Sequence, residues 1–222
     1  MRHIKQTITI AIVFALIAIF LAACMPNEPQ LPSGADGSSA TETESNHTVP
    51  DTPKNEEGEK MLVTYFSCTG TTEGIAKNIA NTAGGKLNQI LPEIPYTTAD
   101  LNYNDNNSRA NKERNDSTAR PAIKDGAISV SNYDAIFLGY PIWWGQAPKI
   151  ISTFLESQDF SDKTIVPFCT SYSSGIGSSD TNLHELVAFA NWLPGKCFAN
   201  GASKTEVSKW IAGLITNDLE KI

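Results

Sequence analysis

The most constraining feature of this sequence is an alternation of short apolar runs and amphipathic helical patterns that begins at Lys60. Nearly continuous apolar runs are typical of strands that are covered on both faces. They occupy residues 61–66, 87–91, 135–139, 164–168 and, more weakly, 196–199. Helical spacing follows most of them, as in Ile75, Ala76, Ile79 and Ala80. The pattern predicts a parallel α/β sheet with helices on both faces and right-handed crossovers.

The first 23 residues have the pattern of a bacterial lipoprotein signal peptide. Two basic residues precede the apolar run Ile8–Ala23, which would rise only about 24 Å as a helix and is short for a bilayer span. The run ends Leu21-Ala22-Ala23-Cys24, which resembles a lipobox. We therefore expect Cys24 to be lipidated and the mature protein to be extracytoplasmic and attached to a bacterial membrane. An uncleaved anchor with a chance cysteine is the alternative.

Residues 24–59 are predicted to be a disordered acidic tether. Residues 25–59 contain five prolines and eight acidic residues against the single base Lys54. An acidic recognition tail is the alternative to a plain spacer. The remaining domain, residues 60–222, carries 16 acidic and 14 basic residues. This near balance argues against nucleic acid as a partner.

Three polar or aromatic loops follow the first, third and fourth apolar strands of the domain, where a parallel α/β sheet binds ligands. Residues 67–72 offer four hydroxyls and the start of a helix without a lysine, which suits a terminal phosphate better than a nucleoside triphosphate. Residues 140–148 contain two tryptophans that could face an aromatic ligand. Residues 170–177 supply N–H donors. Ordinary turns and exposed aromatic residues are the alternative for each loop.

These loops resemble those of the flavodoxin-like family, of the lipoprotein type. Ser67-x-Thr69-Gly70-x-Thr72 is similar to its phosphate loop, and Gly139-Tyr140-Pro141-Ile142-Trp143-Trp144-Gly145 to its flavin loop. The resemblance covers about residues 61–216. It implies a three-layer flavodoxin-like fold, with a five-stranded parallel sheet in the order 2-1-3-4-5, and FMN as the cofactor. The implied FMN contacts are Ser67, Cys68, Thr69, Gly70, Thr71, Thr72, Pro141, Ile142, Trp143, Trp144, Gly145, Thr170, Ser171, Tyr172, Ser173, Ser174 and Gly175.

The implied function is electron transfer or the reduction of small acceptors, either as an FMN-dependent oxidoreductase or as a carrier without enzymatic activity. The redox partner is not indicated by the sequence. The rival hypothesis is a flavin-free module that binds a phosphorylated ligand. We predict no catalytic side chain and no metal site, and the uncharged loops predict little positive charge near the flavin ring.

The sequence also predicts the state of three cysteines and the role of two arginines in a long segment. Cys68 and Cys169 should lie about 10 Å apart, because another strand separates their strands, so they are expected to remain unpaired together with Cys197. Cys68 is expected to be a buried structural thiol, with a redox role as the alternative. In the segment 96–132, Arg109 and Arg120 are expected to pin this excursion to the sheet rather than to bind substrate.

Overall fold

The computed structural model describes residues 60–126 and 128–219. The predicted signal peptide, the lipidation site Cys24 and the tether lie outside the described residues. The strands are β1 (Met61–Tyr65), β2 (Lys86–Gln89), β3 (Ala135–Pro141), β4 (Thr164–Ser171), β5 (Asn191–Trp192) and β6 (Lys196–Ala199). The helices are α1 (Thr71–Ala83), α2 (Arg109–Asn115), α3 (Lys149–Glu156), α4 (Thr181–His184) and α5 (Lys204–Leu214), with a 3₁₀ turn at Glu185–Val187 and a π turn at Ile215–Leu219.

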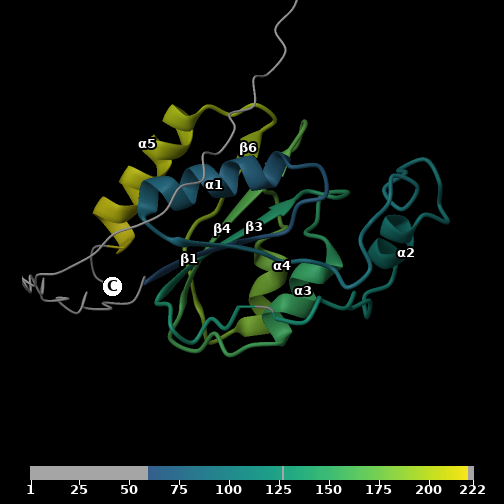
Figure 1. The fold of residues 1–222 in the computed structure, drawn as a ribbon, viewed down its shortest axis with the longest axis horizontal. Helices are drawn as coiled ribbons and strands as arrows, with labels where there is room; N and C mark the ends of the chain where they lie inside the picture. The colour runs from purple at the N-terminus through teal and green to yellow at the C-terminus, as the bar shows by residue number, and fades with distance from the viewer. Residues whose placement is uncertain (1–59, 127, 220–222) are drawn as a thin grey trace, which may run out of the picture. The chain divides into compact units, whose positions relative to one another are not determined.

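The sheet is parallel and has the predicted strand order, β2-β1-β3-β4-β5 (Figure 1). Adjacent residues of each strand point to opposite faces, as the pleat requires. Leu62 is in register with Ile136, which is in register with Ile165, and all three belong to one apolar cluster. The residues that follow them along β1, β3 and β4 form the cluster on the opposite face.

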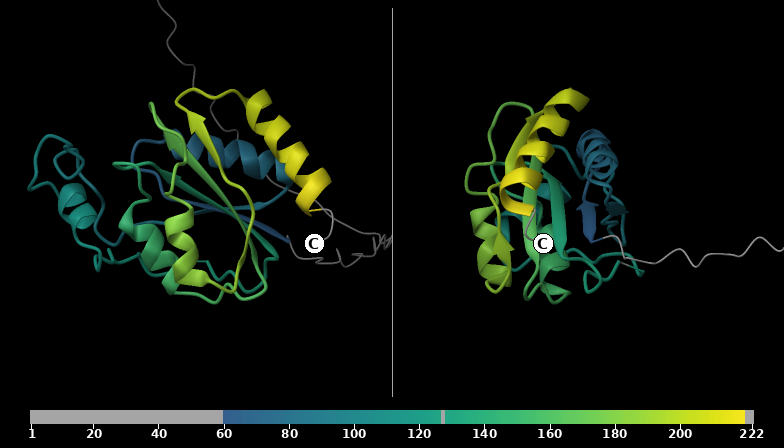
Figure 2. Two further views of the ribbon diagram at one scale, coloured as in Figure 1. Left: turned by 180° about the vertical axis from the view of Figure 1, so that it is seen from behind. Right: turned by 90° about the vertical axis from the view of Figure 1, so that its left-hand side faces the viewer.

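Helices cover both faces of this sheet and give three layers. Figure 2 shows α1 and α5 together on one side and α3 and α4 on the other. Ile75 and Ile79 of α1 and Ile211 of α5 are buried in the first of these layers. Ile151 and Phe154 of α3 are fully buried in the second. The predicted three-layer α/β fold is therefore confirmed.

The fifth position of the sheet is divided between two short strands. Both β5 and β6 pair with β4, β5 at Thr164–Ile165 and β6 at Phe168–Ser171. The sequence between them contains Pro194, which has no N–H to donate to a sheet ladder. The sequence predicted only residues 196–199, because a two-residue strand has no recognisable period.

Two helical expectations need correction. Leu183, Leu186, Val187 and Ala190 have helical spacing in the sequence, which predicts a helix there, but the structure has only four residues of α-helix followed by the 3₁₀ turn. Helix α2, in turn, was not predicted at all. Its sequence RANKERN has no apolar stripe, and its start is instead fixed by Ser108, whose side chain accepts a hydrogen bond from the Asn111 N–H. No helix among residues 60–126 and 128–219 is long and apolar enough to span a bilayer.

Candidate functional site

The three loops predicted from the sequence meet at the carboxyl edge of the sheet. Thr72, in the first turn of α1, shares a 2.8 Å hydrogen bond between hydroxyls with Thr170 at the end of β4. The Thr170 carbonyl accepts a 2.9 Å hydrogen bond from the Ile142 N–H. Gln146, which follows the two tryptophans, accepts a 2.6 Å hydrogen bond from the Asn182 side chain. Direct hydrogen bonds therefore link all three segments.

The loop after β1 forms a polar cradle at the N-terminus of α1. The Gly70 N–H donates to the Ser67 hydroxyl at 3.1 Å, and Gly70 has a φ of 84°, which favours glycine. No side chain caps the helix, so the N–H groups of its first turn face the open side of the loop. A Cβ on Gly70 would meet nothing within 4 Å. The cradle is thus open, uncharged and rich in donors, which fits a phosphate ester.

The two tryptophans of the second loop have different environments. Trp143 is 9% exposed and makes edge-to-face contacts with Phe66 and Tyr96, with centroids 5.7 and 5.4 Å apart. Trp144 is half-buried. It has a φ of 48° in a tight turn, closed by hydrogen bonds in both directions between Trp143 and Gln146. Trp143 therefore belongs to the core, and Trp144 is the more exposed of the two tryptophans.

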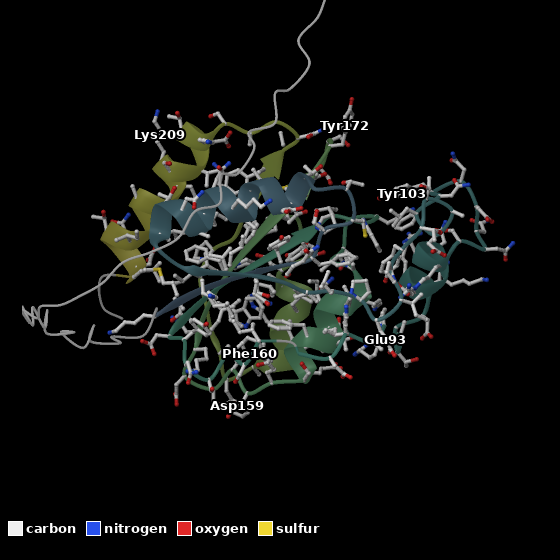
Figure 3. All side chains as sticks on the ribbon, in the orientation of Figure 1. Glu93, Tyr103, Asp159, Phe160, Tyr172 and Lys209 are labelled. Carbon is white, nitrogen blue, oxygen red and sulfur yellow. The ribbon has the colours of Figure 1, made fainter. Side chains whose placement is uncertain are left out.

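Several polar groups of the third loop hydrogen-bond to one another within the loop. The Ser171 hydroxyl accepts from the N–H groups of Ser173 and Ser174 at 3.4 and 3.0 Å and lies 2.7 Å from the Ser174 hydroxyl. Two of the N–H donors expected to serve a flavin are therefore already engaged. Tyr172 is 91% exposed and projects from the end of β4 (Figure 3).

An excursion between β2 and β3 contributes residues to this edge that the sequence did not identify as site residues. Tyr103 packs against Trp144 with centroids 4.4 Å apart, and the Arg114 guanidinium lies 5.2 Å from the Trp144 ring. The sequence contained a run of potential contact residues here, Asp100–Tyr103, but no spacing that assigned them a role. Their approach to Trp144 depends on how the excursion folds back.

A half-buried ion pair organises the base of the excursion. Arg109 Nε donates to Glu113 at 2.6 Å, and its guanidinium lies 3.9 Å above the Tyr96 ring. The Tyr96 hydroxyl donates to the same carboxylate at 2.5 Å, so burial and this hydrogen bond raise the pKa of Tyr96. Arg109 also donates to the Ile94 carbonyl. These contacts show that Arg109 holds segments of the excursion to one another; none of them joins it directly to the sheet.

Arg120 pins the far end of the excursion to the domain. Its Nε and Nη2 donate to the two carboxylate oxygens of Glu156 on α3 at 2.6 and 2.7 Å. Its Nη1 donates to the carbonyls of Ser117 and Ala119. A planar fork that engages both oxygens of a carboxylate fixes orientation as well as distance. The expected structural role of Arg120 is therefore confirmed.

One expectation about the first loop is wrong. Cys68 is exposed rather than a buried structural thiol. Protein around the sulfur nevertheless raises its pKa to about 11, which keeps it protonated at neutral pH. Arg109 and Glu113, which carry opposite charges, both act electrostatically on Cys68. The sequence did not reveal this pair, because 40 residues lie between Cys68 and Arg109.

A cavity of about 590 Å³ lies beside the phosphate cradle. Phe66, Ser67 and Cys68 line one side, and Tyr96 and Lys124 from the excursion line another. Its volume is within the range of small-molecule sites. An open phosphate cradle, a half-buried tryptophan and an adjoining cavity of this size together fit a nucleotide-sized aromatic phosphate.

The fold is a three-layer parallel sheet, and its candidate ligand site lies at the carboxyl edge where the strand order reverses. This arrangement defines the class of doubly wound nucleotide-binding proteins. Within that class, the flavodoxin family model matches residues 60–214. The chain therefore belongs to the flavodoxin family. Family membership supports FMN as the cofactor and electron transfer as the general function.

Solved structures agree with this family. A protein from Bacteroides uniformis described as a flavoprotein is 44% identical, with a TM-score of 0.68 over 70% of this chain and 99% of that chain. A similarly described protein from Bacteroides eggerthii is 43% identical, with a TM-score of 0.66 over 70% and 98%. A flavoprotein from Lactobacillus acidophilus, solved in complex with FMN, is 23% identical, with a TM-score of 0.53 over 69% and 99%, and supports the fold. No curated protein matches this chain.

Proposed function

We propose that this protein is an FMN-binding electron-transfer protein, or a reductase of small acceptors, that a lipid on Cys24 anchors outside the cytoplasm to a bacterial membrane. The observation that carries the cofactor assignment is the uncapped N-terminus of α1, ringed by uncharged hydroxyls and linked by Thr72 to Thr170. The family match supports the same assignment. When bound, FMN supplies the redox chemistry, while the protein supplies position and electrostatic environment.

The cradle residues would bind the FMN phosphate through main-chain N–H groups and the hydroxyls of Ser67, Thr69, Thr71 and Thr72. A dianion gains there from the helix dipole and from short charge-assisted hydrogen bonds. Trp144 would contact the flavin ring, and Tyr103 would restrict water at the same edge. Trp143 would support Trp144 from the core rather than contact the flavin itself. This division refines the set of contacts that the family resemblance implies.

A fluorescence titration of FMN with the full chain tests the cofactor. We expect sub-micromolar binding, with Thr69→Ala weakening it by about tenfold or more, because hydrogen bonds to charged groups contribute about 1.5–3 kcal/mol. Thr82→Ala is the matched control, because Thr82 lies at the other end of α1 and its hydroxyl donates a hydrogen bond to the Asn78 carbonyl. An absence of FMN binding, combined with direct binding of other phosphate esters at the cradle, would favour the flavin-free binding module.

The anchoring part of the proposal rests on the sequence Leu21-Ala22-Ala23-Cys24. Incorporation of a labelled fatty acid in a bacterial host, followed by detergent phase partition, measures it directly. We expect Cys24→Ser to abolish both labelling and partition into the detergent phase. Unchanged partition of Cys24→Ser without labelling would instead indicate an uncleaved apolar anchor.

A further inference from the structure

Two thiols lie side by side at the edge of the sheet, next to the third loop. Cys169 of β4 and Cys197 of β6 are direct partners in the parallel register. Neighbouring strands are about 4.8 Å apart, and registered partners point to the same face, so this spacing falls within the Cα separations that disulfides span. Both residues pack in the same apolar cluster, which shows that their side chains share a face.

The two thiols differ in access and acidity. Cys169 is completely buried, whereas Cys197 is half-buried. The neighbouring Cys169 thiol favours the thiolate of Cys197 and lowers the pKa of Cys197. The neighbouring Cys197 and burial raise the pKa of Cys169. Cys197 is thus suited to attack an incoming disulfide, and Cys169 to resolve the product.

Cys68 cannot take part in this pair. Cys68 follows β1, which β3 separates from β4, and the Cys68 thiol is exposed. Its pKa is raised to about 11. The register therefore singles out one dithiol among the three cysteines of the described residues. The sequence did not indicate it, because 27 residues separate Cys169 from Cys197 and neither lies in a recognisable two-cysteine motif.

We propose that Cys169 and Cys197 form a redox-active dithiol site that exchanges with low-molecular-mass disulfides. The Cys197 thiolate attacks one sulfur of the reagent disulfide, forms a mixed disulfide and releases one thiol. Cys169 then loses its proton and attacks the Cys197 sulfur, which forms the internal disulfide and releases the second thiol. Two cysteine thiols are oxidised to one disulfide, and the reagent is reduced to two thiols.

The oxidation state of this dithiol affects the third loop through the hydrogen bond from Cys197 to Ser174. The Cys197 thiol donates to the Ser174 carbonyl at 3.4 Å, and Ser174 also bonds to Ser171 within the loop. A disulfide sulfur carries no proton, so oxidation removes the hydrogen bond to Ser174. The exchange itself requires no bound FMN, so it stands independently of the proposed cofactor.

Incubation of the full chain with oxidised glutathione, followed by acid quenching, alkylation and peptide mass mapping, tests the proposal. We expect a cross-linked peptide pair containing Cys169 and Cys197, about 2 Da lighter than the two reduced peptides and reversed by dithiothreitol. Cys68 in the same sample is the internal comparison and should gain no internal partner. The Cys169→Ala variant should trap one glutathione on Cys197, whereas Cys197→Ala should leave Cys169 unmodified.

Two outcomes would overturn the proposal. One is that both cysteines remain fully alkylatable at every ratio of oxidised to reduced glutathione. The other is that each cysteine carries its own glutathione without a cross-link. Because the central measurement uses unmutated Cys169 and Cys197, a folding defect in either variant does not affect it. The readout is a mass, so it is also separate from any failure to bind FMN.

Discussion

The hydrogen bond between Thr72 and Thr170 joins the phosphate cradle to the end of β4, and its loss should be measurable in the free energy of unfolding. The two hydroxyls are 2.8 Å apart, and the residues are only 1% and 4% exposed. Thr72→Val keeps the shape of the side chain and leaves the Thr170 hydroxyl without this partner. Leaving a buried polar group unsatisfied costs about 1–3 kcal/mol.

A double-mutant cycle isolates this interaction. Thr72→Val and Thr170→Val should each destabilise the protein by about 1–3 kcal/mol, or lower Tm by about 2–4 °C for each kcal/mol. The double variant should be less destabilised than the sum of the two, because replacing both partners with apolar groups of the same shape is nearly neutral. Urea unfolding followed by circular dichroism measures all four states. Additive effects, with a coupling energy below about 0.5 kcal/mol, would refute the reasoning.

Three further predictions concern single residues. Gly70→Ala should cost about 1–2 kcal/mol in unfolding experiments, because its φ of 84° is unfavourable for alanine, and should also weaken FMN binding in the titration. Gly139→Ala should lower Tm, because its Cβ would lie 2.2 Å from the buried Phe168 ring, at a cost of about 1–3 kcal/mol, whereas the helical control Gly213→Ala meets nothing and should raise Tm slightly. Cys68 should be alkylated with a rate that keeps rising with pH to about 11, because its raised pKa delays thiolate formation; a plateau near pH 9, measured by peptide mapping, would contradict this.

The interrupted fifth strand has a consequence for the site. Because β6 pairs with the last residues of β4, from Phe168 to Ser171, it supports the strand end that carries the third loop. Its residue Phe198 is fully buried and packs edge-on against Trp210 of α5. The support for this loop therefore extends to the helix layer on that face. Strand β5 pairs with β4 only at Thr164 and Ile165, which is the opposite end of β4 from the loops.

The sequence by itself determined the layers and the edge at which the loops meet, while the resemblance to flavodoxins added the strand order. A continuous apolar run indicates a strand that is buried on both faces, and helical spacing of apolar residues indicates a helix with one buried face. The layers of the fold therefore follow from local periodicity. Loops after parallel strands necessarily share an edge, which is why Ser67–Thr72, Trp143–Trp144 and Thr170 could be grouped in advance. The resemblance of their residues to known flavin loops added the cofactor.

Only the tertiary structure decided which of these side chains are available. Trp143 and Trp144 are adjacent in sequence and equally apolar, yet a left-handed turn sends one into the core and leaves the other half-buried. The pairing of Cys169 with Cys197 depends on strand register, which no local pattern encodes. Arg109 reaches the site from a polar excursion without periodicity. Packing, register and long-range charge arise between distant segments, and a linear sequence carries no direct signal for them.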